Sequence, residues 1–270
     1  MSWLASFTQE RDMDLIKRGS HNPTPIGSAV FVGLRALDPL LQYGILAHGV
    51  GSTILTTLGL SVRAPGLPAQ TGIQALDALA LSPPRLLLLA MATGAALKQI
   101  HWRLFISQEE MPAGAALEIA FFNTVNNGVA TLAFTTALLS PSAGDPAEAA
   151  LSPPALVGAA LFAAGLALEW GSELQRVRWK KDPANAGRPY TGGLWRLARH
   201  VNYGGYVLWR AGVAMSGAGW AVGAAFGLLF MWDFATRGVP VMDRYCSGRY
   251  GEDWKRFKEQ TPYKLLPFVY

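Results

Sequence analysis

The residues with the clearest chemical potential gather in a basic stretch before the last apolar segments of the chain. Its polar members include Arg178, Lys180, Arg199, His200, Asn202 and Tyr203. Clustered arginine and lysine side chains bind phosphate oxygens through charge-assisted hydrogen bonds, and the first N–H groups of a helix favour an anion. Basic residues beside apolar segments also set membrane orientation and contact anionic lipid. Charge alone favours this second interpretation over a nucleotide site.

A second polar group lies inside an apolar stretch and consists of one carboxyl and three amides. Its members are Glu118, Asn123, Asn126 and Asn127. Such groups need partners in hydrocarbon, so we expect them to face the interior of a helical bundle. They either join helices by hydrogen bonds or form the polar wall of a substrate cavity. In the second case Glu118 is the candidate proton donor.

The composition indicates the kind of protein that must position these residues. Of 270 residues, 51% are hydrophobic and only 15% are charged, whereas about a quarter are charged in ordinary soluble domains. This balance predicts a membrane protein. The single cysteine excludes a disulfide framework, and the four histidines are too scattered to predict a metal site. The net charge of +5 comes from basic residues that flank apolar segments, so we expect no nucleic-acid partner.

Apolar segments long enough to cross a bilayer recur along the chain. We expect spans at residues 39–60, 86–104, 113–139 and 154–170, then a hairpin of two shorter helices at 203–215 and 220–234. The fold class predicted is an all-α polytopic transmembrane bundle with about five to six membrane helices.

The domain organisation and the orientation follow from these segments. We expect a cytoplasmic lead-in at 1–25, a four-span membrane half at 26–170, and a C-terminal half at 171–270 that holds the basic loop, the hairpin and the tail. Lysine and arginine concentrate in that loop and tail, which places them in the cytoplasm. Both chain ends and the turn at 104–112 then lie on the cytoplasmic side.

Several sequence elements in the C-terminal half match one family in a consistent order. Gly193-Leu-Trp followed by Arg199-His-Val-Asn-Tyr203 resembles the Gly-Leu-Trp and Arg-His-Pro-Asn-Tyr element of steroid 5α-reductases and sterol reductases. Gly238-Val-Pro-Val-Met-Asp243 and the ending at 246–270 resemble later elements of the same membrane family. In the first 150 or so residues only the multi-span architecture is similar.

The resemblance implies a membrane-embedded reductase that binds NADPH in a cytoplasm-facing pocket. It would saturate an activated C=C bond of a lipophilic sterol-like or terpenoid substrate in an internal membrane such as the endoplasmic reticulum, with membrane lipid as its other partner. The resemblance places these residues at the cofactor: Arg178, Lys180, Arg199, His200, Asn202, Tyr203 and Asp243. Tyr203 and Glu118 are the candidate catalytic residues, although Glu118 has no counterpart in the matched elements.

Two departures leave alternatives open. Val201 replaces the family's proline, and Tyr206 stands where most of these reductases have Glu or Asp. The carboxyl methyltransferases that modify prenylated cysteine share the Arg-His-Pro-x-Tyr element, lack that acid, and bind S-adenosylmethionine in a comparable pocket. The alternatives are therefore a methyltransferase of a lipophilic acceptor and a membrane scaffold without catalytic activity.

Overall fold

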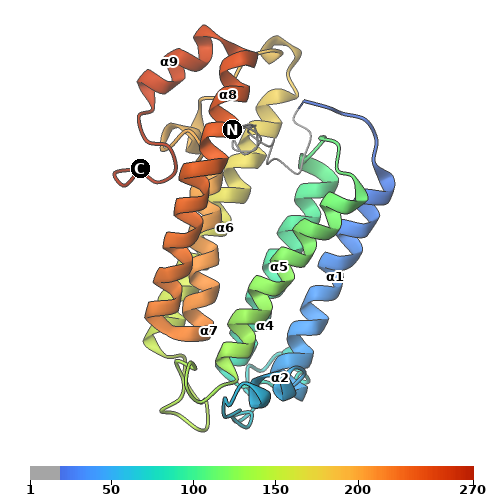
Figure 1. Ribbon diagram of the computed structural model, residues 1–270, viewed down its shortest axis with the longest axis vertical. Helices are drawn as coiled ribbons and strands as arrows, with labels where there is room; N and C mark the ends of the chain where they lie inside the picture. The colour runs from blue at the N-terminus through green and yellow to red at the C-terminus, as the bar shows by residue number, and fades with distance from the viewer. Residues whose placement is uncertain (1–18) are drawn as a thin grey trace, which may run out of the picture.

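A computed structural model describes residues 19–270, and this part of the chain is all-α. The long helices lie side by side in one elongated bundle (Figure 1). These are α1 (Pro25–His48), α4 (Pro83–His101), α5 (Ala113–Phe134), α6 (Pro153–Lys180) and α7 (Val201–Asp233). The shorter helices at the ends are α2 (Ser52–Thr57), α3 (Gln74–Asp77), α8 (Val239–Tyr250) and α9 (Glu252–Gln260). The only pairing of extended chain among the described residues is an isolated bridge between Val62 and Thr136. The predicted all-α fold class is therefore confirmed, whereas the count of five to six membrane helices stays a prediction.

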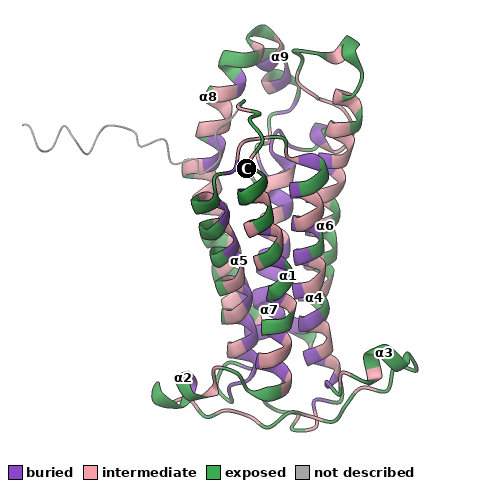
Figure 2. Ribbon diagram, turned by 90° about the vertical axis from the view of Figure 1, so that its right-hand side faces the viewer, coloured by how far each residue is buried: buried purple, intermediate pink, exposed green. Residues whose placement is uncertain are grey.

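Three helices in the described chain are long and apolar enough to cross a membrane: Pro25–His48, Pro153–Lys180 and the continuous stretch Val201–Tyr250. The chain is therefore an integral membrane protein. Helices α4 and α5 run beside them along the bundle (Figure 1). Figure 2 shows buried residues along the inner faces of the long helices and exposed residues on their outer faces.

The first expected span is misplaced. We expected residues 39–60, but the helix begins at Pro25 and ends at His48, where Gly49 adopts a left-handed conformation with φ 66°. The sequence pattern failed because Arg35, Asp38 and Gln42 interrupt the apolar run, yet all three side chains are buried inside the bundle. Polar residues with internal partners do not end a membrane helix.

The other predicted spans lie close to observed helices, with different ends. The segment 86–104 corresponds to α4 and a π-helical turn at Trp102–Ile106, and 113–139 corresponds to α5, which stops at Phe134. The segment 154–170 corresponds to α6, which continues to Lys180. The polar and basic residues after Trp170 extend this helix instead of ending it.

The predicted hairpin at 203–234 is confirmed within α7. The backbone leaves the helical conformation at Ala218 and at Gly219, whose φ is 79°. The two segments then run antiparallel, because the Tyr203 and Phe234 rings stack with centroids 4.6 Å apart and the Tyr206 and Phe230 rings lie 5.4 Å apart.

Helices α6 and α7 approach each other through small residues. A Cβ added at Gly165 would lie 2.5 Å from the Gly205 carbonyl oxygen and the Trp209 nitrogen, and one added at Gly212 would lie 2.5 Å from the Gly158 carbonyl oxygen. Small residues allow this close backbone contact between membrane helices. The contact fixes the first part of α7, which carries the Arg-His-Val-Asn-Tyr element at its start, against α6.

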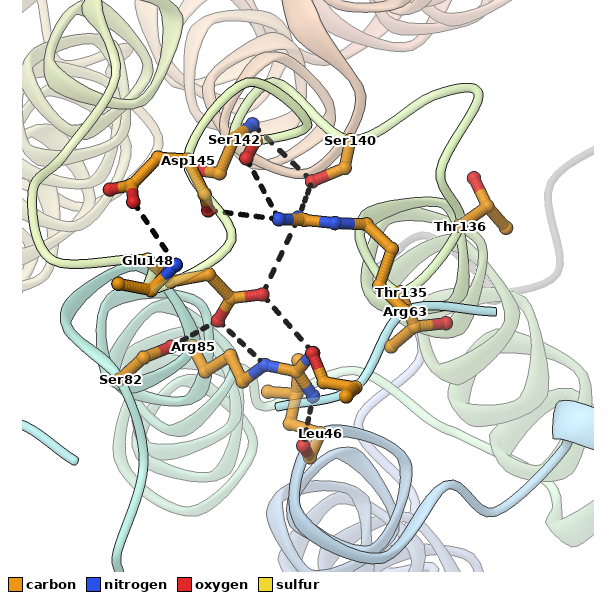
Figure 3. A network of polar contacts seen from close by, with 12 residues as sticks. Leu46, Arg63, Ser82, Arg85, Thr135, Thr136, Ser140, Ser142, Asp145 and Glu148 are labelled. Atoms are coloured by element: carbon orange, nitrogen blue, oxygen red, sulfur yellow. Dashed lines mark hydrogen bonds and ion pairs between the residues drawn. The ribbon is translucent and has the colours of Figure 1, made fainter. Parts of the chain in front are cut away.

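The long loops at one end of the bundle are held by a buried ionic cluster (Figure 3). Glu148 is fully buried and lies between Arg85, at 2.8 Å, and Arg63, at 3.4 Å. Ser82 donates to the same carboxylate, and Arg85 also donates to the Leu46 carbonyl oxygen at 2.5 Å. The cluster therefore ties the loops before α4 and α6 to the end of α1.

The opposite end of the bundle gathers the segments that carry the predicted cofactor residues. There, Ser20 donates to Glu110 in the turn before α5 at 2.6 Å, and the basic loop, α8, α9 and the C-terminal tail lie at the same end (Figure 1). This grouping was expected from loop charge. Most of the expected lead-in at 1–25 falls outside the described residues.

Candidate cofactor and substrate site

The Gly-Leu-Trp element is fixed on the last turns of α6. Gln175 Oε1 accepts the backbone N–H of Leu194 at 2.8 Å, and the Trp195 indole donates to the Ser172 carbonyl oxygen at 2.9 Å. Gly193 has φ 53°, and an added Cβ would lie 2.3 Å from Gln175 Oε1. Only glycine meets both conditions without strain. The basic loop is thus anchored just before α7 begins.

The start of α7 is covered by the C-terminal tail. The backbone N–H groups of Arg199 and His200 donate to the carbonyl oxygens of Tyr263 at 2.9 Å and Lys264 at 2.8 Å. Arg199 Nη1 also donates to the carbonyl oxygen of Thr261 at 2.6 Å. The tail and the start of α7 therefore form one packed unit.

His200 and Tyr203 begin an aromatic stack that leads along α7. The His200 and Tyr203 rings are stacked at 5.6 Å, and Tyr203 stacks in turn on Phe234. Phe234 opens a π-helical turn, Phe234–Gly238, a local irregularity that is frequent at functional sites. Burial, reinforced by the positive charge of Arg199, lowers the pKa of His200 to about 4. The imidazole is therefore neutral at physiological pH.

Asn202 lies beside the last turns of α6 and is held there by a carboxylate. Its Nδ2 donates to Glu173 Oε1 at 2.9 Å, and Glu173 Oε2 accepts from Arg176 at 2.5 Å. The bond orients the Asn202 amide so that its oxygen points away from Glu173. Glu173 is a site residue that sequence reasoning missed.

Three buried polar atoms of this element have no hydrogen-bond partner among the described residues: Arg199 Nε, His200 Nε2 and Asn202 Oδ1. Unsatisfied buried polar atoms are rare in native structures, and these three belong to residues within one turn of chain. They provide a donor, an acceptor and a ring nitrogen that takes either role. A nucleotide cofactor carries matching phosphate, hydroxyl and amide groups, so the residues present fit such a ligand.

The other predicted cofactor residues surround this element to different degrees. Asp243 accepts from the Trp254 indole at 2.8 Å and from Lys258 at 3.4 Å. Lys180 donates to the Arg188 carbonyl oxygen at 2.9 Å and to the Tyr250 hydroxyl at 3.1 Å. Arg178 is exposed on α6. Asp243 and Lys180 thus hold the surrounding loops, whereas Arg178 faces outward.

The expectation for the polar residues of α5 is correct for two of the four. Asn123 and Asn127 are buried in the bundle, but Glu118 lies on the exposed face of the helix and Asn126 is only partly buried. The expected interior position of Glu118 is therefore wrong. The helical period explains the difference, because Glu118 lies on the side of α5 away from the buried Ala116, Ala120 and Asn123.

Asn123 and Asn127 belong to a buried polar network that joins α1, α4, α5 and α7, so the expected hydrogen bonds between helices are present, although sequence reasoning missed the other residues of this network. Its members are Arg35, Asp38, Gln42, Gln99, Asn123, Asn127, Thr131 and Arg210. Arg210 was its available signal, because a lone arginine in an apolar membrane segment indicates an internal partner. Tyr206, the departure from the reductase pattern, receives the Arg210 Nε–H at 3.1 Å.

A groove among the described residues lies away from both groups. Its volume is about 520 Å³, and it is lined by Ala69, Gln70, Thr71, Pro83, Leu86, Leu87, Ala90, Ala149 and Leu151. None of these side chains is charged. The groove therefore offers no group suited to phosphate or to proton transfer.

Comparison with known proteins identifies relatives of two kinds. Residues 103–261 match the DUF1295 family, described as a protein of unknown function. A Ustilaginoidea virens protein named probable O-methyltransferase ustE is 37% identical over 243 residues, which cover 88% of this chain and 84% of that protein. Two proteins named Delta(14)-sterol reductase, from Methylotuvimicrobium alcaliphilum and Gibberella zeae, are 28% and 31% identical.

The extent of the matches differs between the two kinds of relative. The two sterol reductase matches each cover 41% of this chain, and only 29% and 33% of those proteins. The chain thus spans about a third of the length of these reductases, while it matches the methyltransferase-named protein over most of both sequences. The resemblance to sterol reductases and the relation to a methyltransferase are both confirmed.

Proposed function

This chain belongs to the DUF1295 family, and from its partial similarity to sterol reductases and the site at the start of α7 we propose that it is a membrane-embedded oxidoreductase. It uses NADPH to reduce an activated C=C bond of a lipophilic, sterol-like or terpenoid molecule. The observation that supports this most directly is the set of unpartnered buried atoms on Arg199, His200 and Asn202. These residues form the element that resembles sterol reductases.

The cofactor would lie against the start of α7 and the C-terminal tail. Arg199 Nε would hold a phosphate, and Lys180 would add positive charge from α6. Asn202 Oδ1 would accept from a ribose hydroxyl or from the carboxamide of the nicotinamide, and Asp243 would orient the basic side chains. Bound NADPH supplies a hydride. The stacked rings of Tyr203 and Phe234 provide a flat apolar wall that excludes water from the reacting carbon.

The lipophilic substrate enters from the bilayer and contacts residues of the membrane half at 26–170. The protein resides in an internal membrane such as the endoplasmic reticulum. The basic loop and the C-terminal tail, which share one end of the bundle (Figure 1), face the cytoplasm because they are rich in Lys and Arg. The N-terminus lies on the same side in this proposal. That side also supplies soluble NADPH.

A second candidate is an S-adenosylmethionine-dependent methyltransferase of a lipophilic acceptor. Two observations favour it: Tyr206 replaces the acidic residue of the reductases, and the methyltransferase-named protein matches 88% of the chain. The same unpartnered atoms of Arg199 and Asn202 suit the carboxylate and ribose of that cofactor. A scaffold without catalytic activity is the third candidate.

Ligand-dependent stability of the full-length protein in detergent separates these candidates. A ligand at a hundred times its Kd stabilises the folded state by about 2.7 kcal/mol. We expect NADPH to raise the Tm and S-adenosylmethionine to leave it unchanged. The reverse result would establish the methyltransferase, and no shift with either ligand would support the scaffold.

A further inference from the structure

Arg210 lies deep in the membrane bundle and is bonded only to neutral groups among the described residues. Its side chain donates to Asn127 Oδ1 at 3.0 Å, to Asn123 Oδ1, and to the Tyr206 hydroxyl. The guanidinium also lies over the Trp209 ring, 4.2 Å from its centroid. Only 2% of the residue is exposed. A buried cation without a carboxylate partner is costly in an apolar medium.

The surrounding network does not neutralise this charge. Arg35 is fully buried and pairs with Asp38 at 3.1 Å, while Lys98 pairs with Glu169, which also accepts the Trp209 indole N–H. Asp38 is already shared, because Gln42 and Asn127 donate to it at 2.9 Å and 2.7 Å. Among these described residues the basic groups exceed the carboxylates by one, and Arg210 is the one without an acid.

The network also holds a buried donor without a partner. Arg35 Nε has no hydrogen-bond acceptor within residues 19–270, and Arg35 and Arg210 are close enough for their charges to interact. Gln99, which donates to Asn123 at 2.6 Å, has an unpartnered oxygen. The network thus combines excess positive charge with polar atoms that lack protein partners.

This network is connected to the cofactor residues along one face of α7. Tyr203, Tyr206 and Arg210 follow each other at helical spacing, and Phe234 packs on both tyrosine rings. Phe230 completes the aromatic surface beside Tyr206 at 5.4 Å. A molecule bound along this face would have its apolar body against the aromatic rings and one end at Arg210.

We propose that the guanidinium groups of Arg210 and Arg35 bind an anionic oxygen at the polar end of the substrate, which is therefore a lipophilic acid. The proposal rests on the proposed function for the role of this ligand as the substrate. Hydrogen bonds between an ionised donor and an ionised acceptor are the strong ones, and burial in a low dielectric strengthens them further. Neutral lipids of the same shape leave the Arg210 charge unmatched.

The test measures binding of cholanic acid and of its methyl ester to full-length protein in phosphatidylcholine nanodiscs at pH 8. The two probes share one apolar body and differ in the charge of the polar end. We expect the wild-type protein to bind the acid at least about tenfold more tightly, which corresponds to about 1.4 kcal/mol. Equal affinities for the two probes would overturn the proposal without any variant.

Two variants then locate the charge that recognises the acid. Arg210→Gln removes it, and Asn123→Asp gives Arg210 a resident carboxylate in an almost unchanged shape. We expect both to lose the preference for the acid, and Asn123→Asp to keep or raise the Tm. Arg256→Gln, at an arginine 66% exposed in α9, is the control and retains the preference. A preference that persists in a folded Arg210→Gln or Asn123→Asp protein would overturn the proposal.

The Tm shift with NADPH separates this inference from the proposed function. All four proteins should keep the shift, because Arg210 and Asn123 lie outside the cofactor residues. A wild-type protein that prefers the acid but shows no NADPH shift would support the acid site and contradict the proposed reductase. An NADPH shift without a preference for the acid would support the proposed reductase and contradict the acid site.

Discussion

Arg199 Nη1 lies 2.6 Å from the carbonyl oxygen of Thr261, so one edge of this guanidinium holds the C-terminal tail. Its Nε, on the opposite edge of the guanidinium, has no hydrogen-bond partner in the part of the chain that the structure describes. Arg199 therefore has two roles. Its side chain fixes the tail and also presents a donor to the proposed cofactor. Loss of the side chain should affect both.

Substitution of Arg199 by alanine should abolish the Tm shift with NADPH and loosen the tail. Without its hydrogen bonds to Thr261 and Pro262, the tail should be cleaved faster by trypsin after Lys264. Mass spectrometry of the digest gives the rate. Arg196→Ala, at an exposed arginine of the same loop, is the matched control and should change neither quantity. An undiminished NADPH shift in Arg199→Ala would exclude Arg199 from cofactor binding.

His200 should make the stability of the protein depend on pH. Burial lowers its pKa to about 4 in the folded state, against about 6.5 in the unfolded chain. Above pH 6.5 both states are neutral and the stability is complete. As the pH falls from 6.5 to 4 only the unfolded state binds the proton, so the folded state loses up to about 3 kcal/mol.

The contribution of His200 is isolated by comparing the wild-type protein with His200→Gln. The Tm of each is measured in detergent at intervals between pH 7.5 and 4. We expect the wild-type Tm to fall more steeply over this range, since glutamine does not titrate. Parallel curves would show that His200 is protonated to the same extent in both states.

Glu148→Gln should destabilise the protein strongly. The substitution leaves Arg63 and Arg85 in a buried site without their shared carboxylate, and breaking a buried ion pair costs about 3–5 kcal/mol. Chemical unfolding followed by tryptophan fluorescence measures the loss. Glu252→Gln, at a glutamate whose side chain is 82% exposed, should change the stability very little. A similar small effect at both positions would contradict the ionic role of Glu148.

Gly165→Ala should weaken the contact between α6 and α7. The added methyl would meet the backbone of Gly205 and Trp209 at 2.5 Å, and overpacking of this kind costs about 1–3 kcal/mol. Gly128→Ala places the same methyl in α5 with no atom within 4 Å, so it should be neutral or stabilising because alanine favours helices. The Tm values of the two variants should therefore change in opposite directions. Equal changes would show that helix propensity dominates at both positions.

The fold was largely predictable because its membrane segments are apolar over stretches longer than those of most helices in soluble proteins. Hydropathy located the hairpin of α7, the regions of α4 to α6 and the end of the bundle that carries the basic segments. It misplaced α1 because Arg35, Asp38 and Gln42 read as interruptions, although each has a buried partner on α1 or α5. Partners across helices are set by tertiary packing, which a single sequence does not contain.

The site was predictable where residue identity carried the information. The Arg-His-Val-Asn-Tyr element was identified by its order, and the structure shows unpartnered atoms on three of its members. Glu118 was misassigned because residue type alone did not distinguish the inner face of α5 from its outer face. Glu173 was missed because its role depends on Asn202, a residue 29 positions later in the chain.

The length of α6 sets the distance between a water-soluble reagent bound at its C-terminal end and a lipid-soluble reagent held in the bilayer. Its 28 residues extend for about 42 Å, whereas the hydrocarbon layer is about 30 Å thick. The final turns of α6 therefore extend beyond the hydrocarbon layer, and they anchor the loop through Gln175 and Ser172. A reagent that is charged at one end and reactive at the other, and long enough to reach from those turns down to the lipid boundary, suits this layout. A small compact one would be held too far from a partner dissolved in the bilayer.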